Sequence, residues 1–340
     1  MVAGPGALEG VGLRSGFVTG AYGLLGSRLV PALLGRDVRV TVLRRDEPAL
    51  SALILEGTEA RVDVVDGDVR DAGLVERALA QCQADTVFHL AAQTLVGTAL
   101  RSPASTFDTN VRGTWTVLEA CRRVGVERVV VAASDKAYGS ADELPYREDT
   151  PLRPRFPYDA SKAAADLIAR SYWHTYRLPV AVTRLANLYG GGDLNFSRLV
   201  PEAVAAALQG RAPVIRSDGT PERDYLYVDD AVDAYLAIAD LFDRDADAVC
   251  GEAFNAGSGA PTSVLELVRA VCAAAQVELE PDVRGEAEGE IDRQYVDASK
   301  LRAATGWEPR VPLEEGLRRT VAWYRAHPEV LPAAPVEPLA

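Results

Sequence analysis

"GFVTGAYGLLG", residues 16–26, is a short apolar run that passes through three glycines into a helical pattern. In a strand–turn–helix unit that binds a dinucleotide, the first glycine permits a tight turn and the second lets the backbone approach a pyrophosphate. The third lets the helix pack against the strand, and the helix N-terminus faces the negative charge. A glycine-rich turn without a ligand is the alternative. The residues that we expect to hold the cofactor at this loop are Gly20, Tyr22, Gly23, Leu24, Leu25 and Gly26.

The rest of the first half alternates β-branched runs with helical ones, which indicates a parallel sheet covered by helices on both faces. We therefore predict an α/β fold of the doubly wound, Rossmann type. After about residue 190, pieces punctuated by glycine and proline predict a smaller mixed α/β lobe that binds the substrate. The expected division is a disordered extension, 1–14; a dinucleotide-binding domain, 15–187, to which 224–257 return; a substrate-binding lobe, 188–223 and 258–328; and a tail, 329–340.

Charge and composition restrict the function classes. The chain has 340 residues and a formal net charge of -13, which argues against nucleic acid as a partner, because phosphate-backbone binding needs clustered Lys and Arg. The four cysteines lack the paired spacing of a zinc site, so we expect no metal. No apolar stretch of about 18 residues and no signal-peptide block occur. We expect a cytoplasmic protein that does not enter a membrane.

The second predicted strand ends in Arg44, Arg45 and Asp46. An arginine at the first polar position suits the 2′-phosphate of NADP, whereas a carboxylate there holds the ribose hydroxyl of NAD. Arg44 takes that position, with Arg45 beside it, which slightly favours NADP over NAD. The alternative is that Asp46 occupies the position, since exposed arginines are common at strand ends. Asp68 and Val69 follow the third strand, where they are expected to meet the adenine ring. Capping of the next helix is the alternative for these two residues.

Tyr158 and Lys162 lie four residues apart at the start of a predicted helix, so both project from one face. A lysine charge beside a tyrosine lowers the pKa of the phenol, which makes it a general base near neutral pH. The same spacing is frequent by chance. On its own, the pair does not establish a catalytic site.

Several motifs in a fixed order resemble one superfamily. They are the glycine loop, FHLAAQ (88–93), SDKAYG (134–139), the Tyr-x-x-x-Lys pair, RLANLYGGGD (184–193) and RDYLYVDDAVDAYL (223–236). From about residue 15 to 325, the chain resembles the extended short-chain dehydrogenase/reductase superfamily. The resemblance implies NAD(P) as the cofactor. It also implies that the cofactor contacts Leu90, Ala91 and Ala92.

In this superfamily a hydroxyl residue joins the tyrosine and lysine in a triad, which maps onto Ser134, Tyr158 and Lys162. Lys162 would also hold the nicotinamide ribose. The two positions after the hydroxyl residue are small or hydroxylic in sugar-nucleotide 4-epimerases and ionisable in nucleotide-sugar 4,6-dehydratases. Here they are Asp135 and Lys136, a pair that resembles the CDP-glucose and some UDP-N-acetylglucosamine dehydratases. The TDP-glucose enzymes carry Asp-Glu there.

The dehydratase resemblance implies internal hydride transfer through bound NAD(P), which turns an NDP-hexose into an NDP-4-keto-6-deoxyhexose. Tyr158, helped by Ser134, would take the C4 hydroxyl proton as C4 passes its hydride to the nicotinamide. Lys136 would remove the C5 proton made acidic by the C4 ketone. Protonated Asp135 would give a proton to the departing C6 hydroxyl, and the hydride would return to C6.

Other readings of the same residues stay open. A 4-epimerase, or a related decarboxylase or reductase, would use Tyr158 as a catalytic residue. Asp135 and Lys136 would then only be polar residues of the pocket lining. A purely structural alternative is an N-cap-like turn with an exposed ion pair. A non-catalytic NAD(P)-binding regulator is the remaining class, but it has no need of the intact triad.

The resemblance also implies a set of substrate-binding residues. An arginine suits the diphosphate of the substrate, because its guanidinium can donate two parallel hydrogen bonds. Asn187 and Arg223 match positions that contact the sugar-linked phosphates, whereas the loop after "HLAA" would line the sugar pocket or only be solvated. The expected substrate-binding residues are Gln93, Thr94, Ser134, Asn187, Asn195, Arg198 and Arg223. The nucleobase stays open, because 215–230 resemble the pattern of epimerases and TDP-glucose dehydratases, whereas Arg44-Arg45 resembles the GDP-mannose dehydratases.

Two long segments, 104–125 and 158–177, carry more apolar positions than one buried stripe requires. Many relatives dimerise through two such helices per subunit. We therefore expect a homodimer.

Overall fold

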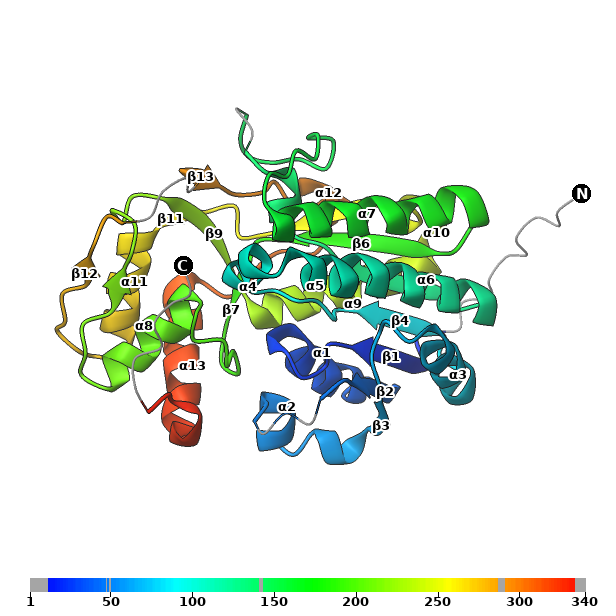
Figure 1. Ribbon diagram of the computed structural model, residues 1–340, viewed down its shortest axis with the longest axis horizontal. Coiled ribbons are helices and arrows are strands. Elements are labelled where there is room, and N and C mark those ends of the chain that lie inside the picture. Colours follow the sequence, from blue (N-terminus) through cyan, green and yellow to red (C-terminus); the bar gives the residue numbers. More distant parts are fainter. Residues whose placement is uncertain (1–11, 47, 49, 141–142, 287–290, 334–340) are drawn as a thin grey trace, which may run out of the picture.

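The structure is a computed structural model that describes residues 12–46, 48, 50–140, 143–286 and 291–333. Within these residues, seven parallel strands form one sheet in the order β10-β6-β5-β4-β1-β2-β3 (Figure 1). The strands are β1 (Ser15–Thr19), β2 (Arg39–Arg44), β3 (Asp63–Asp66), β4 (Thr86–His89), β5 (Arg128–Ala132), β6 (Val180–Leu185) and β10 (Ala253–Ala256). The chain winds outward from β1 in both directions. This confirms the predicted Rossmann-type α/β fold.

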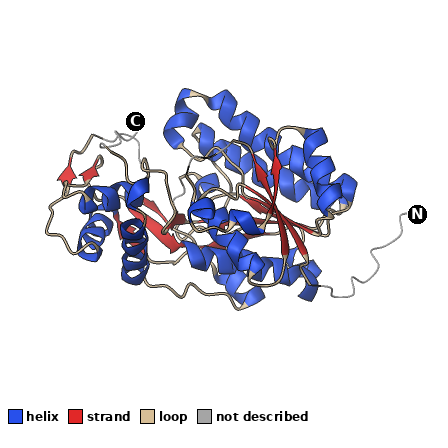
Figure 2. Cartoon of the chain, turned by 90° about the horizontal axis from the view of Figure 1, so that it is seen from below, coloured by secondary structure: helices blue, strands red, loops and turns tan. Residues whose placement is uncertain are grey.

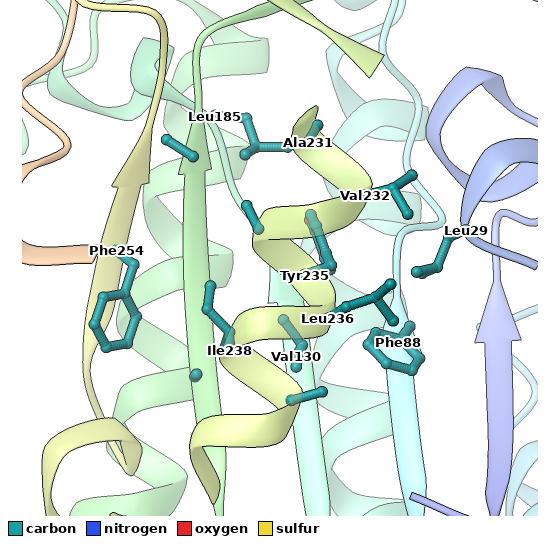
Figure 3. Packing of buried hydrophobic residues seen from close by; sticks show 14 of the residues in the cluster. Leu29, Phe88, Val130, Leu185, Ala231, Val232, Tyr235, Leu236, Ile238 and Phe254 are labelled. Atoms are coloured by element: carbon teal, nitrogen blue, oxygen red, sulfur yellow. The ribbon is translucent and has the colours of Figure 1, made fainter. Parts of the chain in front are cut away.

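Helices cover both faces of this sheet, as its continuous apolar strands require. One face carries α1 (Leu24–Leu34), α2 (Ala52–Leu55), α9 (Val228–Arg244), α10 (Ala246–Val249) and α12 (Ser299–Thr305). The other carries α3 (Ala72–Cys82), α4 (Val96–Arg101), α5 (Pro103–Phe107), a π-helical turn (Asp108–Arg112), α6 (Gly113–Val124) and α7 (Pro157–Tyr176). Figure 3 shows α9 laying Tyr235, Leu236 and Ile238 over the sheet, toward Phe88 and Val130.

A smaller lobe is built around β9 (Glu222–Tyr227), which pairs with three short strands. These partners are β7 (Asn187–Tyr189), β11 (Pro261–Ser263) and β13 (Arg293–Gln294); a separate pair is β8 (Val214–Ile215) with β12 (Asp282–Val283). The lobe's helices are α8 (Leu199–Leu208), α11 (Val264–Ala274) and α13 (Leu313–Ala326). They pack on one another around a core of their own, beside the larger lobe (Figure 2).

Short 3₁₀ turns occur at Glu59–Arg61, Asp135–Tyr138 and Pro328–Val330. We propose the two-lobe division expected from the sequence, with two changes. Although 224–257 were expected to return to the larger lobe, β9 pairs with the short strands of the smaller lobe, so 224–227 belong there. Although 258–328 were assigned to the smaller lobe, α12 packs on α9 and β10 and so belongs to the larger one.

Parts of the predicted extension and tail contact the folded protein, so both are shorter than expected. Leu13 packs against the core of the larger lobe, and the Arg14 amide donates to Asp85 Oδ2 at 3.0 Å. At the other end, Val330 is buried against the smaller lobe and Gln209 Nε2 donates to the carbonyl of Pro332 at 2.8 Å. These apolar contacts and hydrogen bonds hold Leu13, Arg14, Val330 and Pro332 to the fold. The remaining parts of the predicted extension and tail, 1–11 and 334–340, lie outside the described residues.

None of the helices in the described part of the chain is long and apolar enough to cross a membrane. Nor do the described His, Cys, Asp and Glu side chains form a group of three or more that could hold a metal ion.

Candidate active site

A cavity of about 790 Å³ lies at the carboxyl ends of the strands, between the two lobes. This is the edge at which open α/β sheets bind their ligands. All five predicted catalytic residues line it: Ser134, Asp135, Lys136, Tyr158 and Lys162. Of the other predicted residues, the cavity is lined by Gly20, Tyr22, Gly23, Leu24, Leu25, Gly26, Arg45, Asp68, Val69, Leu90, Ala91, Ala92, Thr94, Asn187, Asn195 and Arg198. Arg44, Gln93 and Arg223 do not line it.

The glycine loop forms a cradle that side chains would fill. Gly20 has a φ of +75°, and a Cβ there would lie 2.7 Å from the backbone nitrogen of Ala91. A Cβ on Gly26 would lie 2.3 Å from the Gly20 carbonyl oxygen, so only glycine lets α1 pack this closely. Gly23 is the N-cap of α1 and supplies no side-chain cap, which leaves the first helical amides available to an anion. The loop therefore fits a dinucleotide pyrophosphate.

Arg44 is held away from the predicted ribose position. Its guanidinium bonds Asp66 of the neighbouring strand, with Nε 2.6 Å from Oδ1, and approaches Glu59 at 3.3 Å. Glu59 also accepts from the Tyr22 hydroxyl at 2.5 Å. In place of Arg44, the next two residues, Arg45 and Asp46, line the cavity. Of the predicted pair, Arg45 lines the cavity and Arg44 does not, because β2 continues through Arg44 and its ladder partner is Asp66.

The hydroxyl, carboxylate and amine that follow β5 lie on the Asp135 turn (Asp135–Tyr138). Ser134 caps this turn: its Oγ accepts from the Lys136 amide at 3.2 Å and donates to Asp135 Oδ1 at 3.1 Å. The Asp135 side chain is buried, with Asp135 only 1% exposed, and its Oδ2 has no hydrogen-bond partner among the described residues. Burial raises the pKa of the Asp135 carboxyl, although Lys136 and Ser134 act in the opposite direction. The alternative of an exposed Asp-Lys ion pair therefore does not hold.

Tyr158 and Lys162 project from the first turns of α7, which begins at Pro157. Lys162 Nζ donates to the Ala132 carbonyl at 2.8 Å, and burial lowers the pKa of Lys162 to about 8. Burial raises the pKa of Tyr158 to about 12, opposed by the charge of Arg198 and a hydrogen bond with Ser134. The expected lowering by the neighbouring lysine does not occur, because desolvation is the larger effect.

Two polar residues at the Asp135 turn were missed by the sequence analysis. Lys136 Nζ donates at 3.0 Å to Oε1 of Gln294, a buried residue of β13 in the smaller lobe. Asp159 is buried beside the turn, and burial raises its pKa to about 6 despite the charge of Lys136. Asp159 follows Tyr158 directly, so its neighbourhood could have been anticipated. Nothing in the local sequence of Gln294 points to Lys136, which lies 158 residues earlier.

The predicted substrate residues divide into two groups. Arg198 reaches across the cavity, with Nη1 3.0 Å from Asp193 Oδ2 and Nη2 donating to Thr94 Oγ1 at 3.2 Å. Asn195 and Asn187 also line the cavity. By contrast, the Gln93 amide turns back to the Leu95 carbonyl and to Thr106.

The sequence also placed Arg223 in the site. Arg223 points instead to the carbonyl of Glu222, with Nη1 donating at 2.9 Å. It does not line the cavity, although its charge acts against the raised pKa of the Asp135 carboxyl at the cavity wall.

A family model and several known proteins resemble this chain along most of its length. The family model described as GDP-mannose 4,6 dehydratase matches residues 17–320. A dTDP-glucose 4,6-dehydratase of Xanthomonas campestris pv. campestris is 34% identical over 329 residues, covering 90% of this chain and 92% of the relative. A crystal structure of a dTDP-glucose 4,6-dehydratase from Streptomyces venezuelae with NAD bound has 32% identity and a TM-score of 0.84, covering 96% of this chain and 100% of that one.

A UDP-glucose 4-epimerase of Thermotoga maritima, solved with UDP-glucose, has a TM-score of 0.85 and 29% identity, covering 92% of this chain and 99% of that one. The shared fold therefore extends to epimerases, as the resemblance implied. The family match over 304 residues (17 to 320), together with the dehydratases above 30% identity, confirms the resemblance to the dehydratases. The chain belongs to the GDP-mannose 4,6-dehydratase family, a branch of nucleotide-sugar 4,6-dehydratases within the extended short-chain dehydrogenase/reductase superfamily.

Proposed function

We propose that this protein is a nucleotide-sugar 4,6-dehydratase that converts an NDP-hexose into an NDP-4-keto-6-deoxyhexose. The observation that carries the proposal is Asp135, a buried carboxyl at the cavity wall with one unpaired oxygen and a raised pKa. A carboxyl in these surroundings favours its protonated form, in which it can give a proton to a leaving hydroxyl. A 4-epimerase has no leaving group and needs no such acid.

Tyr158 and Ser134 are assigned to the C4 hydroxyl of the sugar. Tyr158 takes the hydroxyl proton, and its contact with Ser134 orients the phenol. When bound, NAD would accept the hydride released by C4, and its reduced form would return that hydride to C6. Since burial holds the pKa of Tyr158 near 12, cationic groups are needed to favour the phenolate, and Arg198 is one of them.

Lys136 and Asp135 are assigned to the loss of water. The C4 ketone makes the C5 hydrogen acidic, and Lys136 takes this proton while the C5–C6 double bond forms. The C6–O bond breaks, and the leaving hydroxyl receives the proton of Asp135 and departs as water. Asp135 is then a carboxylate and Lys136 an ammonium, so the pair stores the proton that C5 later regains.

The cofactor that we propose is NAD rather than NADP. The preference for NADP rested on Arg44, which is bonded to Asp66 and does not line the cavity. Asp46 lines the cavity and is paired with Arg45 at 2.6 Å, so a carboxylate is available to the ribose hydroxyl and would repel a 2′-phosphate. Titration with NAD and NADP tests this. Tighter NADP binding would contradict it.

The first substrate candidate is dTDP-glucose, supported by the relatives and the solved structures named as dTDP-glucose 4,6-dehydratases. The test is incubation with a panel of dTDP-, GDP-, CDP- and UDP-hexoses, followed by mass analysis. We expect one nucleotide sugar to lose a single water without consumption of added NAD. A new isomer of equal mass, with no loss of water from any sugar, would instead make the protein an epimerase.

Substitution of the acid separates these outcomes. In Asp135→Asn, loss of water should slow about 10²–10⁴-fold, as expected when a general acid is removed. Oxidation at C4, followed as reduced nicotinamide in a single turnover, should persist. Asp240→Asn, on the exposed side of α9, is the matched control. Equal loss of both steps in Asp135→Asn would contradict the assignment of Asp135.

We also propose a homodimer formed through α6 and α7, the two segments singled out in the sequence. Trp115 on α6 is 46% exposed and Leu167 on α7 is 57% exposed, and Tyr176 is also exposed on α7. Large apolar side chains left exposed on adjacent helices are typical of an interface.

A further inference from the structure

Gln294 is the feature of the cavity region that the proposed mechanism leaves unexplained. It is fully buried in β13, at 0% exposure, and its Oε1 accepts from Lys136 Nζ at 3.0 Å. Lys136 belongs to the larger lobe and β13 to the smaller one, so this hydrogen bond joins the two lobes at the Asp135 turn.

The backbone of β13 is held from two sides. On one side it pairs with β9, where Gln294 is opposite Arg223. On the other, the Tyr146 amide donates to the Tyr295 carbonyl at 3.0 Å, and the Asp297 amide donates to the Tyr146 carbonyl at 2.8 Å. The Gln294 amide is therefore a fixed acceptor, placed by the sheet of the smaller lobe rather than by the Asp135 turn itself.

Packing does not explain a glutamine at this position. Gln294 Nε2 is buried and has no hydrogen-bond partner among the described residues, which costs stability. A leucine would fill a similar volume without this penalty. The polar contact that the side chain does make is the one to Lys136. The hydrogen bond to Lys136 therefore explains why this position carries an amide side chain.

An amide acceptor suits a lysine that must act as a base. A neutral amine donates one N–H to Gln294 Oε1 and keeps its lone pair free, so the hydrogen bond can direct the lone pair into the cavity. A carboxylate in the same place would favour the ammonium form, which cannot accept a proton. Charged groups already face this region: Asp135 on the turn, Asp159 on α7, and Arg223 with Asp224 on β9.

We propose that Gln294 is a positioning residue that holds the Lys136 amine toward C5 of the sugar without placing a carboxylate beside it. The inference rests on the proposed function, in which Lys136 is the base of the elimination. It adds that a residue of the smaller lobe orients this base. The rate of water loss should therefore depend on the hydrogen bond between Lys136 of the larger lobe and Gln294 of the smaller one.

The experiment compares Gln294→Leu, Gln294→Glu and Lys136→Met with the wild type, using dTDP-glucose or the panel sugar that the wild type dehydrates. Arg293→Ala is the matched control, because it removes the exposed ion pair of the same strand with Glu222 and leaves Gln294 in place. Reduced nicotinamide in a single turnover reports oxidation, and deuterium uptake at C5 reports proton removal. Thermal melting of each variant reports folding.

Gln294→Leu should oxidise C4 at the wild-type rate but remove the C5 proton roughly 10–100-fold more slowly, less than the loss in Lys136→Met. In Gln294→Glu the acidic limb of the pH–rate profile for elimination should move to higher pH, whatever the loss in rate. Arg293→Ala should match the wild type.

The outcomes separate the inference from the proposed function. Wild-type elimination in both Gln294 variants, with Lys136→Met inactive, would overturn the role of Gln294 alone. Equal loss of oxidation and elimination in a folded Gln294→Leu would also overturn it, because a structural defect affects both steps. Normal elimination in Lys136→Met, or no loss of water from any sugar by the wild type, would overturn the proposed function and the inference with it.

Discussion

Removal of Arg184 should destabilise the protein far more than removal of an exposed arginine. The Arg184 and Asp166 side chains are 1% and 0% exposed, and their contact is bidentate, with Nε–Oδ2 at 2.8 Å and Nη2–Oδ1 at 3.1 Å. Arg184 also donates to the Tyr138 hydroxyl at 2.8 Å and to the Glu148 carbonyl at 3.0 Å. Its guanidinium lies 4.9 Å from the centroid of the Tyr138 ring, at the end of the Asp135 turn. The pair therefore ties β6 and α7 to the catalytic turn.

Arg184→Met leaves Asp166 buried without its cation, which costs about 3–5 kcal/mol. The entropy of unfolding of a 340-residue chain is about 0.7 kcal/mol/K, so the expected fall in Tm is about 4–7 °C. In Arg184→Met with Asp166→Leu, the unpaired charge is gone and only the hydrogen bonds to Tyr138 and Glu148 are lost. The double variant should therefore recover about 2–3 kcal/mol.

The assay is chemical and thermal unfolding of the two single variants and the double variant. The matched control is Arg36→Met, which removes a bidentate contact with Asp240 between side chains that are 44% and 46% exposed. Its cost should be less than about 1 kcal/mol. A similar small cost for Arg184→Met, or a double variant less stable than either single one, would refute the reasoning that an uncompensated buried charge dominates.

Three further outcomes are expected. Lys162→Met should abolish activity yet raise stability at pH 7 by about 2 kcal/mol, because burial disfavours the ammonium and only one hydrogen bond is lost. Since the pKa of Lys162 is lowered from 10.5 to about 8, the gain should be complete below pH 8 and fade as pH rises toward 10.5; a gain that grows with pH would contradict this. Gly26→Ala should weaken NAD binding at least about tenfold in titration, because its Cβ would lie 2.3 Å from the Gly20 carbonyl oxygen, and unchanged affinity would refute the close approach of α1. Trp115→Glu with Leu167→Glu should give monomers in sedimentation, and a persistent dimer would place the interface elsewhere.

The glycine loop, the parallel sheet and the ordered motifs could be predicted from the sequence because their signals are local. Gly20 and Gly26 are required by contacts within one strand–turn–helix unit, so their spacing is visible in the chain. Continuous apolar strands indicate burial on both faces before any partner is known. Ser134 and Tyr158 were found in the same way, because each follows a recognisable strand or begins a recognisable helix, and both line the cavity.

Other features depended on partners far away in the chain. Arg44 was expected at the cofactor, but the register of β2 with β3 pairs it with Asp66. Arg223 was expected at the diphosphate, but its Nη1 donates to the Glu222 carbonyl and the residue does not line the cavity. Strand register is set by pairing between segments, which no single segment encodes.

The sequence by itself therefore determined the Rossmann-type fold, the cofactor loop and the residue types of the catalytic centre. Only the tertiary structure decided the protonation preferences of these groups and the contact of Lys136 with Gln294, 158 residues away. The pKa values of Tyr158 and Asp135 are shifted mainly by burial. Burial is a property of everything that packs around a side chain, so it arises only once the whole chain has folded.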